Sequence, residues 1–371
     1  MQTHDINIHC YAPLISPAEL ENEMPVTSES AYTVVEGRRV IQDIIGQRDR
    51  RLMVITGPCS IHDEAAALEY ARRLRQLQEK VRNSLVLIMR VYFEKPRTTL
   101  GWKGLINDPF LDGSCDMMSG LRKARRLMCR ITAMGVPTAT ELLDPVTPQY
   151  LTDLVCWAAV GARTTESQTH REMASGLSMP VGFKNGTDGG LATAINAIIA
   201  ARSPQSFLGI DRHGRSCIVR TTGNHCAHLV LRGGSRPNYD SVSIRDALEQ
   251  LNQKKLPATV VVDCSHDNCR KRFQEQSMVW RDVVKQRIGG NDRIVGLMLE
   301  SNLHEGTQEN LGDLARMRFG VSITDACISW ENTVSMIAAA HEQLTACLPS
   351  SPVVSALAGA EARSADVSLF A

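Results

Sequence analysis

The chain has 371 residues, of which 43% are apolar, and its 41 basic and 40 acidic residues leave a net charge of +1. So small a charge argues against nucleic acid or an anionic membrane surface as partner. No apolar run approaches the roughly 20 residues that span a bilayer, and the N-terminus lacks a signal-peptide pattern, so we expect a cytoplasmic protein. The eleven cysteines show no CxxC pair and are expected to be reduced.

The first 50 residues have weak periodicity and several breakers. Ser16 followed by Pro17 is typical of a helix start, and residues 31–46 form an amphipathic stretch. We interpret residues 1–50 as a regulatory or oligomerisation extension that the catalytic unit does not need.

From residue 52 onward, strand-like and helix-like segments alternate. We predict strands at residues 52–59, 85–93, 137–143, 157–162, 181–184, 229–232, 258–264 and 294–301, and helices at 63–81, 117–134, 148–154, 169–177, 191–201, 243–253, 271–288 and 330–346. Eight such units predict an α/β fold, a closed (β/α)₈ TIM barrel over residues 51–348.

Two segments depart from this alternation. Residues 206–228 contain two short apolar runs around Asp211-Arg212-His213-Gly214, which predicts an inserted β-hairpin. The tail at residues 349–371 is rich in Ser and Ala and is expected to be disordered.

Polar residues stand at the ends of the predicted strands. Four β-branched residues lead to Asp263, and that run ends on His266. Other runs end on Cys59, Arg90, Lys184, Arg232 and Glu300. Because chemistry in parallel α/β proteins is placed at the carboxyl ends of the strands, we expect these groups to converge on one face.

One candidate site is a metal centre made of Cys59, His266, Glu300 and Asp325. A thiolate, an imidazole and two carboxylates suit a divalent metal such as Mn, Fe, Co or Zn. The competing interpretation is that the cysteine and the histidine are ordinary packed residues, which is the commoner role of each taken alone.

A second candidate is an anion site formed by six cations: Arg90, Lys95, Arg97, Arg163, Lys184 and Arg232. Cations in such places are costly unless paired, and arginine binds carboxylate and phosphate bidentately. Glu94, Glu141 and Asp144 could instead serve as ion-pair partners, and Lys184 could form a Schiff base with a carbonyl substrate. The Gly-rich residues 186–190 offer backbone N–H groups to an anion.

The long loop after the second strand carries Glu94-Lys95-Pro96-Arg97-Thr98-Thr99. Two cations and two hydroxyls on a proline-stiffened segment suit a phosphate, and the length of the loop favours a functional role over a merely solvated one.

These segments together resemble a known family. The shared motifs are Gly57-Pro58-Cys59-Ser60, Lys95-Pro96-Arg97-Thr98, Gly161-Ala162-Arg163-Thr164-Thr165-Glu166-Ser167, Gly182-Phe183-Lys184-Asn185-Gly186-Thr187, Leu231-Arg232-Gly233-Gly234, Asp263-Cys264-Ser265-His266 and Thr324-Asp325-Ala326-Cys327. They resemble type I 3-deoxy-D-arabino-heptulosonate 7-phosphate (DAHP) synthases of the longer, feedback-regulated subgroup. The resemblance runs from about residue 12 to about residue 346, and no functional motif residue is lost.

The resemblance implies a reaction and a set of roles. Phosphoenolpyruvate and D-erythrose 4-phosphate would condense with water to DAHP and phosphate, the first step of the shikimate pathway to aromatic amino acids. One divalent metal per subunit would be held by Cys59, His266, Glu300 and Asp325. Phosphoenolpyruvate would be bound by Arg90, Lys95, Glu141, Arg163, Lys184 and Arg232, and erythrose 4-phosphate by Arg97, Thr98 and Asp325. Lys95, His266 and Cys59 would be catalytic, with Lys95 and His266 the candidates for proton transfer.

The resemblance also implies feedback inhibition by an aromatic amino acid in a homodimer or homotetramer. The inhibitor site would combine the N-terminal segment with Pro148, Gln149, Leu177 and Ser178 across a subunit interface. Residues 263–266 favour tyrosine as effector and residues 17–20 favour tryptophan, so its identity stays open. Two rival functions remain: a Schiff-base aldolase using Lys184, and a catalytically silent barrel that binds an aromatic amino acid.

Overall fold

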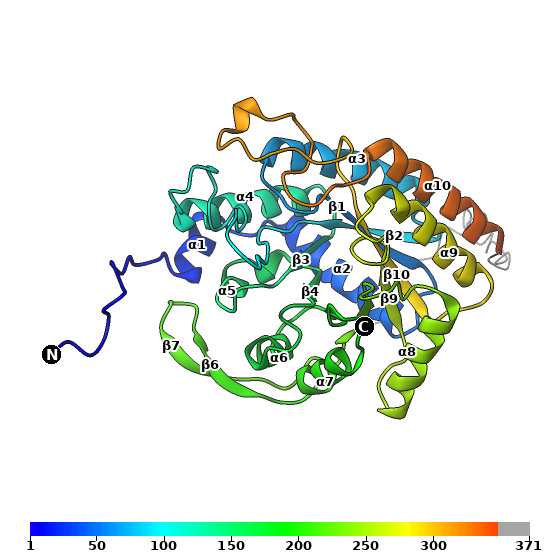
Figure 1. Cartoon of the computed structure of the whole chain (residues 1–371), viewed down its shortest axis with the longest axis horizontal. Helices are drawn as coiled ribbons and strands as arrows, with labels where there is room; N and C mark the ends of the chain where they lie inside the picture. The colour runs from blue at the N-terminus through cyan, green and yellow to red at the C-terminus, as the bar shows by residue number, and fades with distance from the viewer. Residues whose placement is uncertain (348–371) are drawn as a thin grey trace, which may run out of the picture.

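The computed structural model describes residues 1–347, so the predicted tail at 349–371 lies outside the described residues. Eight parallel strands close into one barrel in the order β1-β10-β9-β8-β5-β4-β3-β2, which confirms the predicted TIM barrel (Figure 1). The barrel strands are β1 (Leu52–Gly57), β2 (Leu85–Arg90), β3 (Thr138–Glu141), β4 (Trp157–Val160), β5 (Val181–Lys184), β8 (His228–Leu231), β9 (Val260–Asp263) and β10 (Ile294–Glu300).

The helices that follow the strands form the outer layer. They are α3 (Glu64–Val81), α4 (Met117–Ala133), α5 (Pro148–Leu151), α6 (Gln168–Ser175), α7 (Ala192–Ala201), α8 (Ser241–Gln253), α9 (Gln276–Ile288) and α10 (Trp330–Cys347), with 3₁₀ turns η1 (Thr152–Leu154), η2 (Phe273–Glu275) and η3 (Leu314–Arg316). Among the described residues, no helix is long and apolar enough to span a bilayer. Within residues 1–347 every cysteine is a free thiol.

Two predicted helices depart most from their expected course, while the others differ by one or two residues at an end. The helix expected from residue 271 begins at Gln276, because Arg270 and Lys271 adopt positive φ angles of 51° and 59°, which an α-helix excludes. The helix expected at 148–154 divides into α5 and η1, where the chain tightens after Leu151.

The N-terminal segment folds into α1 (Pro17–Glu23) and α2 (Ser28–Ile45). Ser16 caps α1 in a capping box with Glu19. The buried face of α2, with Val34, Ile41 and Ile44, shares one apolar cluster with the residues that fill the barrel interior. Leu20 of α1 lies in the main core cluster and Ile15 packs against it, so only residues 1–14 of the extension, which are all exposed, are free of core packing.

The inserted hairpin consists of β6 (Ser206–Ile210) and β7 (Ser216–Arg220), which form a separate antiparallel sheet. Its turn lies against α1, where Ala18 N donates to Arg212 O at 2.8 Å and Arg212 pairs with Glu21 at 2.5 Å. Tyr150 of α5 donates its hydroxyl to Ile15 O at 2.7 Å. The segment around α1 therefore joins α5 to the hairpin within one chain, on one side of the barrel (Figure 1).

The alternation of side chains along the strands explains where the polar groups lie. Interior positions lower in the barrel are apolar, and they are Met53, Ile55, Ile88, Ala139, Trp157, Ala159, Val230, Val261 and Met298. Every second residue of a barrel strand points inward. Nearer the carboxyl ends, the inward-pointing residues are Arg90, Glu141, Lys184, Arg232, Asp263 and Glu300. The strands thus deliver a ring of charged groups to the carboxyl end of the barrel.

Candidate active site

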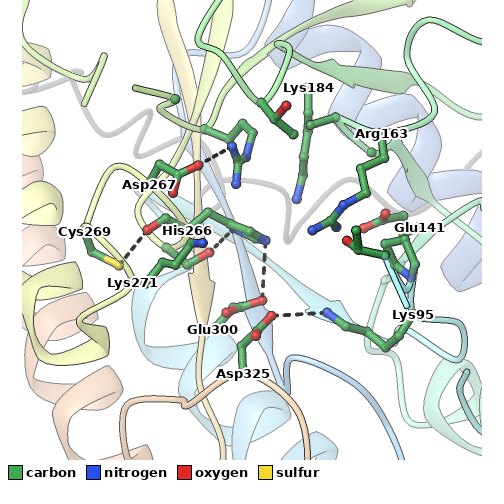
Figure 2. A pocket seen from close by; sticks show the side chains of 18 of the residues that line it. Lys95, Glu141, Arg163, Lys184, His266, Asp267, Cys269, Lys271, Glu300 and Asp325 are labelled. Atoms are coloured by element: carbon green, nitrogen blue, oxygen red, sulfur yellow. Dashed lines mark hydrogen bonds and ion pairs between the residues drawn. The ribbon is translucent and has the colours of Figure 1, made fainter. Parts of the chain in front are cut away.

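A cavity of about 710 Å³ opens at this end of the barrel (Figure 2). Ten of the predicted site residues line it: Lys95, Arg97, Thr98, Glu141, Arg163, Lys184, Arg232, His266, Glu300 and Asp325. Cys59 and Arg90 lie beneath its surface and contact the lining residues directly. The structure therefore brings together all twelve residues that the sequence assigned to metal and substrates.

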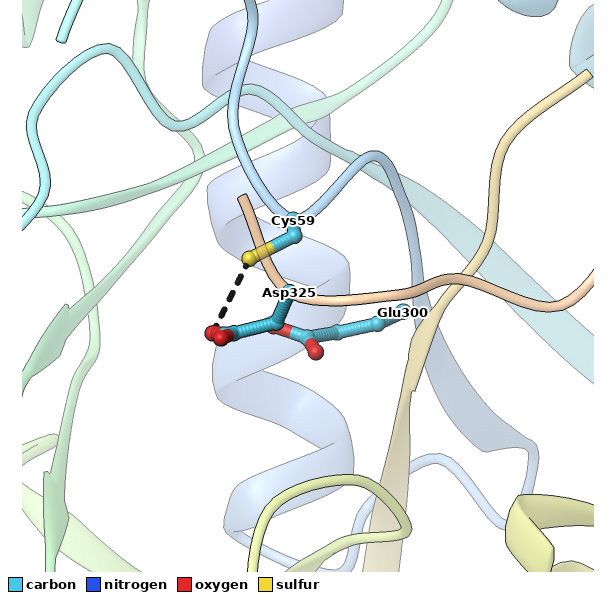
Figure 3. A group of neighbouring side chains, drawn as sticks. All are labelled: Cys59, Glu300 and Asp325. Carbon is cyan, nitrogen blue, oxygen red and sulfur yellow. Dashed lines mark hydrogen bonds between the residues drawn. The ribbon is translucent and has the colours of Figure 1, made fainter. Parts of the chain in front are cut away.

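Three of the four predicted metal ligands form a tight cluster. Cys59, Glu300 and Asp325 each contribute one ligand atom, and these three atoms lie within 4.8 Å of one another (Figure 3). The Cys59 thiol donates to Asp325 Oδ2 at 3.3 Å. The fourth, His266, points its Nε2 toward Glu300 Oε1 at 4.0 Å (Figure 2). The thiol and the two carboxylates of the cluster, with the His266 nitrogen beside Glu300, are donor types that suit a borderline divalent cation.

The surroundings of this cluster shift the pKa values of Cys59 and Asp325 in opposite directions. Burial raises the pKa of the Cys59 thiol to about 12, and the Glu300 carboxylate adds to the effect. Burial opposes ionisation of Asp325 as well, but Lys95 and His266 outweigh it and lower the pKa of Asp325 to about 2. Lys95 Nζ lies 3.0 Å from Cys59 Sγ and 3.5 Å from Asp325 Oδ2. A cation bound by the cluster would favour the thiolate, because metal coordination deprotonates thiols.

Each of the four buried cations of the site has an acidic partner, and none of these partners is one that the sequence suggested. The pairs are Arg90–Glu300 at 2.9 Å, Lys184–Asp263 at 3.1 Å, Arg232–Asp267 at 2.5 Å and Lys95–Asp325 at 3.5 Å. Within residues 1–347 no ion pair reaches Glu94, Glu141 or Asp144, so the predicted alternative partners were wrong. Glu94 is buried beside Thr147, and burial together with Asp144 raises its pKa to about 8.

Arg90 is the most enclosed of the cations. Its Nε and Nη2 donate to the carbonyls of Pro58 and Cys59, both at 3.0 Å, and its guanidinium lies 3.6 Å from the centre of the Tyr92 ring. Through Glu300 and the backbone of Cys59, Arg90 therefore contacts two of the predicted metal ligands at once.

Arg163, Arg97 and Thr98 are exposed at the mouth of the cavity. Arg97 Nε donates to Trp102 O at 2.7 Å, which closes the tip of the loop on itself. Unlike the buried cations, these side chains are accessible to an anion that enters from solvent.

The four predicted inhibitor residues lie away from this cavity. Pro148 and Gln149 belong to α5, while Leu177 and Ser178 follow α6. Leu177 O accepts from Asn224 Nδ2 at 3.2 Å, which ties this turn to the segment between β7 and β8. Their grouping into one inhibitor site stays a proposal.

Three further cavity or core residues had not been assigned roles. Asp263 and Asp267 pair with predicted substrate cations, and Tyr92 supports Arg90. Asp263 and Tyr92 lie at positions where the alternation of side chains along β9 and β2 predicts an inward direction, so the sequence could have indicated them. Asp267 follows the left-handed residue His266 (φ 57°), so no strand periodicity predicts its direction.

The fold and the cavity define a TIM-barrel enzyme with its active site at the carboxyl end of the strands. The chain matches the DAHP synthetase I family over residues 23–338 and belongs to that family. It is 53% identical over 331 residues to the Tyr-sensitive phospho-2-dehydro-3-deoxyheptonate aldolase of Escherichia coli K12, covering 89% of this chain and 93% of the relative. The Phe-sensitive enzyme of the same organism is 51% identical over 336 residues, covering 91% and 96%.

A solved structure agrees with the sequence relatives. The phospho-2-dehydro-3-deoxyheptonate aldolase from Francisella tularensis SCHU S4 superposes with a TM-score of 0.89 at 44% identity, covering 91% of this chain and 99% of that one. The resemblance stated from the motifs is thereby confirmed.

Proposed function

We propose that this enzyme condenses phosphoenolpyruvate with D-erythrose 4-phosphate and water to give DAHP and phosphate, the first step of the shikimate pathway. The observation that carries the proposal is the joining of a Cys59–Glu300–Asp325 cluster and a ring of cations in one cavity. The names of the relatives quoted above support the same reaction.

Cys59, His266, Glu300 and Asp325 are the residues that would hold a divalent metal. Bound there, the metal would supply Lewis-acid activation of the aldehyde oxygen. Mn²⁺, Fe²⁺, Co²⁺ and Zn²⁺ all suit this mixed donor set.

The cations position the enol phosphate. Arg163, Lys184 and Arg232 line the cavity and offer N–H donors to its phosphate and carboxylate oxygens, while buried Arg90 contributes positive charge from below. Carbon 3 of phosphoenolpyruvate attacks the aldehyde carbon, and the new alkoxide takes a proton. Water then adds to carbon 2, and the tetrahedral intermediate expels phosphate with cleavage of the carbon–oxygen bond. Lys95 and His266 are our candidates for the proton transfers.

The experiment that tests this course of reaction follows isotopic oxygen. Turnover in H₂¹⁸O is expected to place label on carbon 2 of the product and none in the released phosphate, as mass spectrometry would show. Label in the phosphate would mean attack at phosphorus, and the condensation as written would be abandoned.

Two rival functions fit the structure less well. A Schiff base requires a neutral amine, whereas Lys184 lies 3.1 Å from the fully buried carboxylate of Asp263. A silent regulatory barrel has no need of a complete ligand cluster, yet Cys59, Glu300 and Asp325 lie within 4.8 Å of one another. Borohydride trapping of substrate on Lys184 would favour the first rival.

We predict a division of labour among the cavity arginines. Arg232→Ala and Arg163→Ala should raise the KM for phosphoenolpyruvate more than that for erythrose 4-phosphate, and Arg97→Ala should do the reverse. Loss of one charge-assisted contact costs ~1.5–3 kcal/mol, roughly a ten- to hundredfold loss of affinity. Arg281→Ala on the exposed face of α9 is the control, because within residues 1–347 its one side-chain hydrogen bond is from Nε to the Ser277 carbonyl. Equal effects of all three variants on both substrates would refute the division.

We also predict feedback inhibition by an aromatic amino acid. The coupling between effector and substrate should be worth ~1–3 kcal/mol. Deleting residues 1–13, which are exposed and precede α1, should abolish inhibition and keep the barrel folded, whereas deletion through residue 45 would remove the core helix α2. The measurement is turnover of both proteins against tyrosine, phenylalanine and tryptophan. If none of the three inhibits the full chain at millimolar concentration, the regulatory proposal fails; inhibition that survives the deletion would place the effector site at the hairpin instead.

A further inference from the structure

Asp263 contacts one proposed metal ligand, His266, and one proposed substrate cation, Lys184, at the same time. It ends β9 and is fully buried. Its Oδ2 lies 3.1 Å from Lys184 Nζ and 3.1 Å from His266 Nδ1. Lys184 is itself 2% exposed, so this carboxylate is shared by two functional groups without intervening solvent.

The second oxygen of Asp263 fixes the neighbouring serine. Asp263 Oδ1 accepts from Ser265 N at 3.0 Å and from Ser265 Oγ at 2.6 Å. Because the Ser265 hydroxyl gives its proton to Asp263, its oxygen faces His266 Nδ1 as an acceptor, at 2.6 Å. His266 Nδ1 thus has Ser265 Oγ as its hydrogen-bond partner and the Asp263 carboxylate 3.1 Å away, and both favour the imidazole proton on Nδ1.

This tautomer leaves the lone pair of His266 Nε2 free. Nε2 is the atom that faces Glu300 Oε1 at 4.0 Å, on the side of the metal-ligand cluster. Histidine ligands in metal sites commonly donate their other N–H to a carboxylate, which fixes the tautomer and orients the ring. Asp263 and Ser265 supply that arrangement for a residue whose backbone is held at φ 57°.

We propose that Asp263 is a positioning residue that joins the two halves of the site: it presents His266 Nε2 to the metal and at the same time holds Lys184 for the enol phosphate. The inference rests on the proposed function and deepens it. Its consequence is that metal affinity and phosphoenolpyruvate affinity both depend on one buried carboxylate.

The test compares Asp263→Asn with two variants, each of which changes only one of the two contacts of Asp263. Asp263→Asn should raise the Kd for Mn²⁺ about 10- to 100-fold, the range found when outer partners of metal ligands are lost. It should also raise the Kd for phosphoenolpyruvate, measured at saturating Mn²⁺, by about tenfold, a typical cost of one lost charged contact. Ser265→Ala should weaken Mn²⁺ binding alone, and Lys184→Met should weaken phosphoenolpyruvate binding alone. Isothermal titration on the full chain gives both constants.

A second readout needs no variant. The ¹⁵N shifts of His266 in the metal-free wild type should show the proton on Nδ1, and Asp263→Asn should give a mixture of tautomers. A proton on Nε2 in the wild type, or wild-type affinities for both ligands in folded Asp263→Asn, would overturn the inference. Failure of the wild type to bind Mn²⁺ would instead count against the proposed metal-dependent function.

Discussion

Replacing Cys59 by alanine is expected to lower turnover by about three orders of magnitude or more, because the proposed metal-dependent reaction would need the complete ligand set. The side chain is fully buried and touches Asp325 and Lys95, so alanine removes the sulfur donor without exposing new surface. The same loss should follow treatment of the wild type with dipicolinate. Added Mn²⁺ or Co²⁺ should restore the wild type and leave Cys59→Ala inactive at equal concentrations.

The matched control for this variant is Cys156→Ala. Cys156 is also buried, but its sulfur lies 3.9 Å from the carbonyls of Thr33 and Val34 in α2, at the opposite end of the barrel. The Cys156→Ala variant should therefore keep near-wild-type turnover. Cys59→Ala with normal turnover, or wild type that keeps full activity in chelator, would remove the thiolate from the site.

Of the variants proposed here, Arg90→Met should lower the free energy of unfolding most, and it should also abolish activity. Arg90 is 1% exposed, and its removal leaves Glu300 as a buried carboxylate without its cation. Breaking a buried ion pair from one side costs about 3–5 kcal/mol. Urea unfolding followed by circular dichroism measures the change, and turnover at 25 °C measures the accompanying effect on the site.

Arg122→Met provides the comparison for this charge-to-methionine change. Arg122 pairs with Glu23 at 2.7 Å, but the two side chains are 35% and 43% exposed. Exposed pairs contribute roughly 0–1 kcal/mol, so this variant should unfold close to wild type and remain active. Similar stabilities for Arg90→Met and Arg122→Met would contradict the bracing role assigned to Arg90.

Much of the site follows from the sequence because strand periodicity is local. The strand ends at Arg90, Lys184, Arg232 and Glu300 could be placed on one face from alternation alone, and the structure puts them there. The barrel followed from counting eight strand–helix units, and the motifs identified the family, which the comparisons confirm.

The partners of these groups could not be predicted in the same way. Arg90 pairs with Glu300, which is 210 residues away, and that choice depends on barrel closure between β1 and β10. From the sequence, Glu94, Glu141 and Asp144 were possible partners, whereas the observed partners are Glu300, Asp325, Asp263 and Asp267. The late start of α9 depended on left-handed residues that composition does not reveal. That α2 belongs to the core could not be predicted either, because it depends on the packing of α2 against the residues that fill the barrel interior.

The measurement that tests the central claim most directly is phosphate release by the metal-loaded full chain. With phosphoenolpyruvate and erythrose 4-phosphate together, phosphate should appear in equal amounts with DAHP. Omitting either substrate or adding chelator should abolish its release. Phosphate released from phosphoenolpyruvate alone, or no product from the complete mixture, would contradict the proposed condensation.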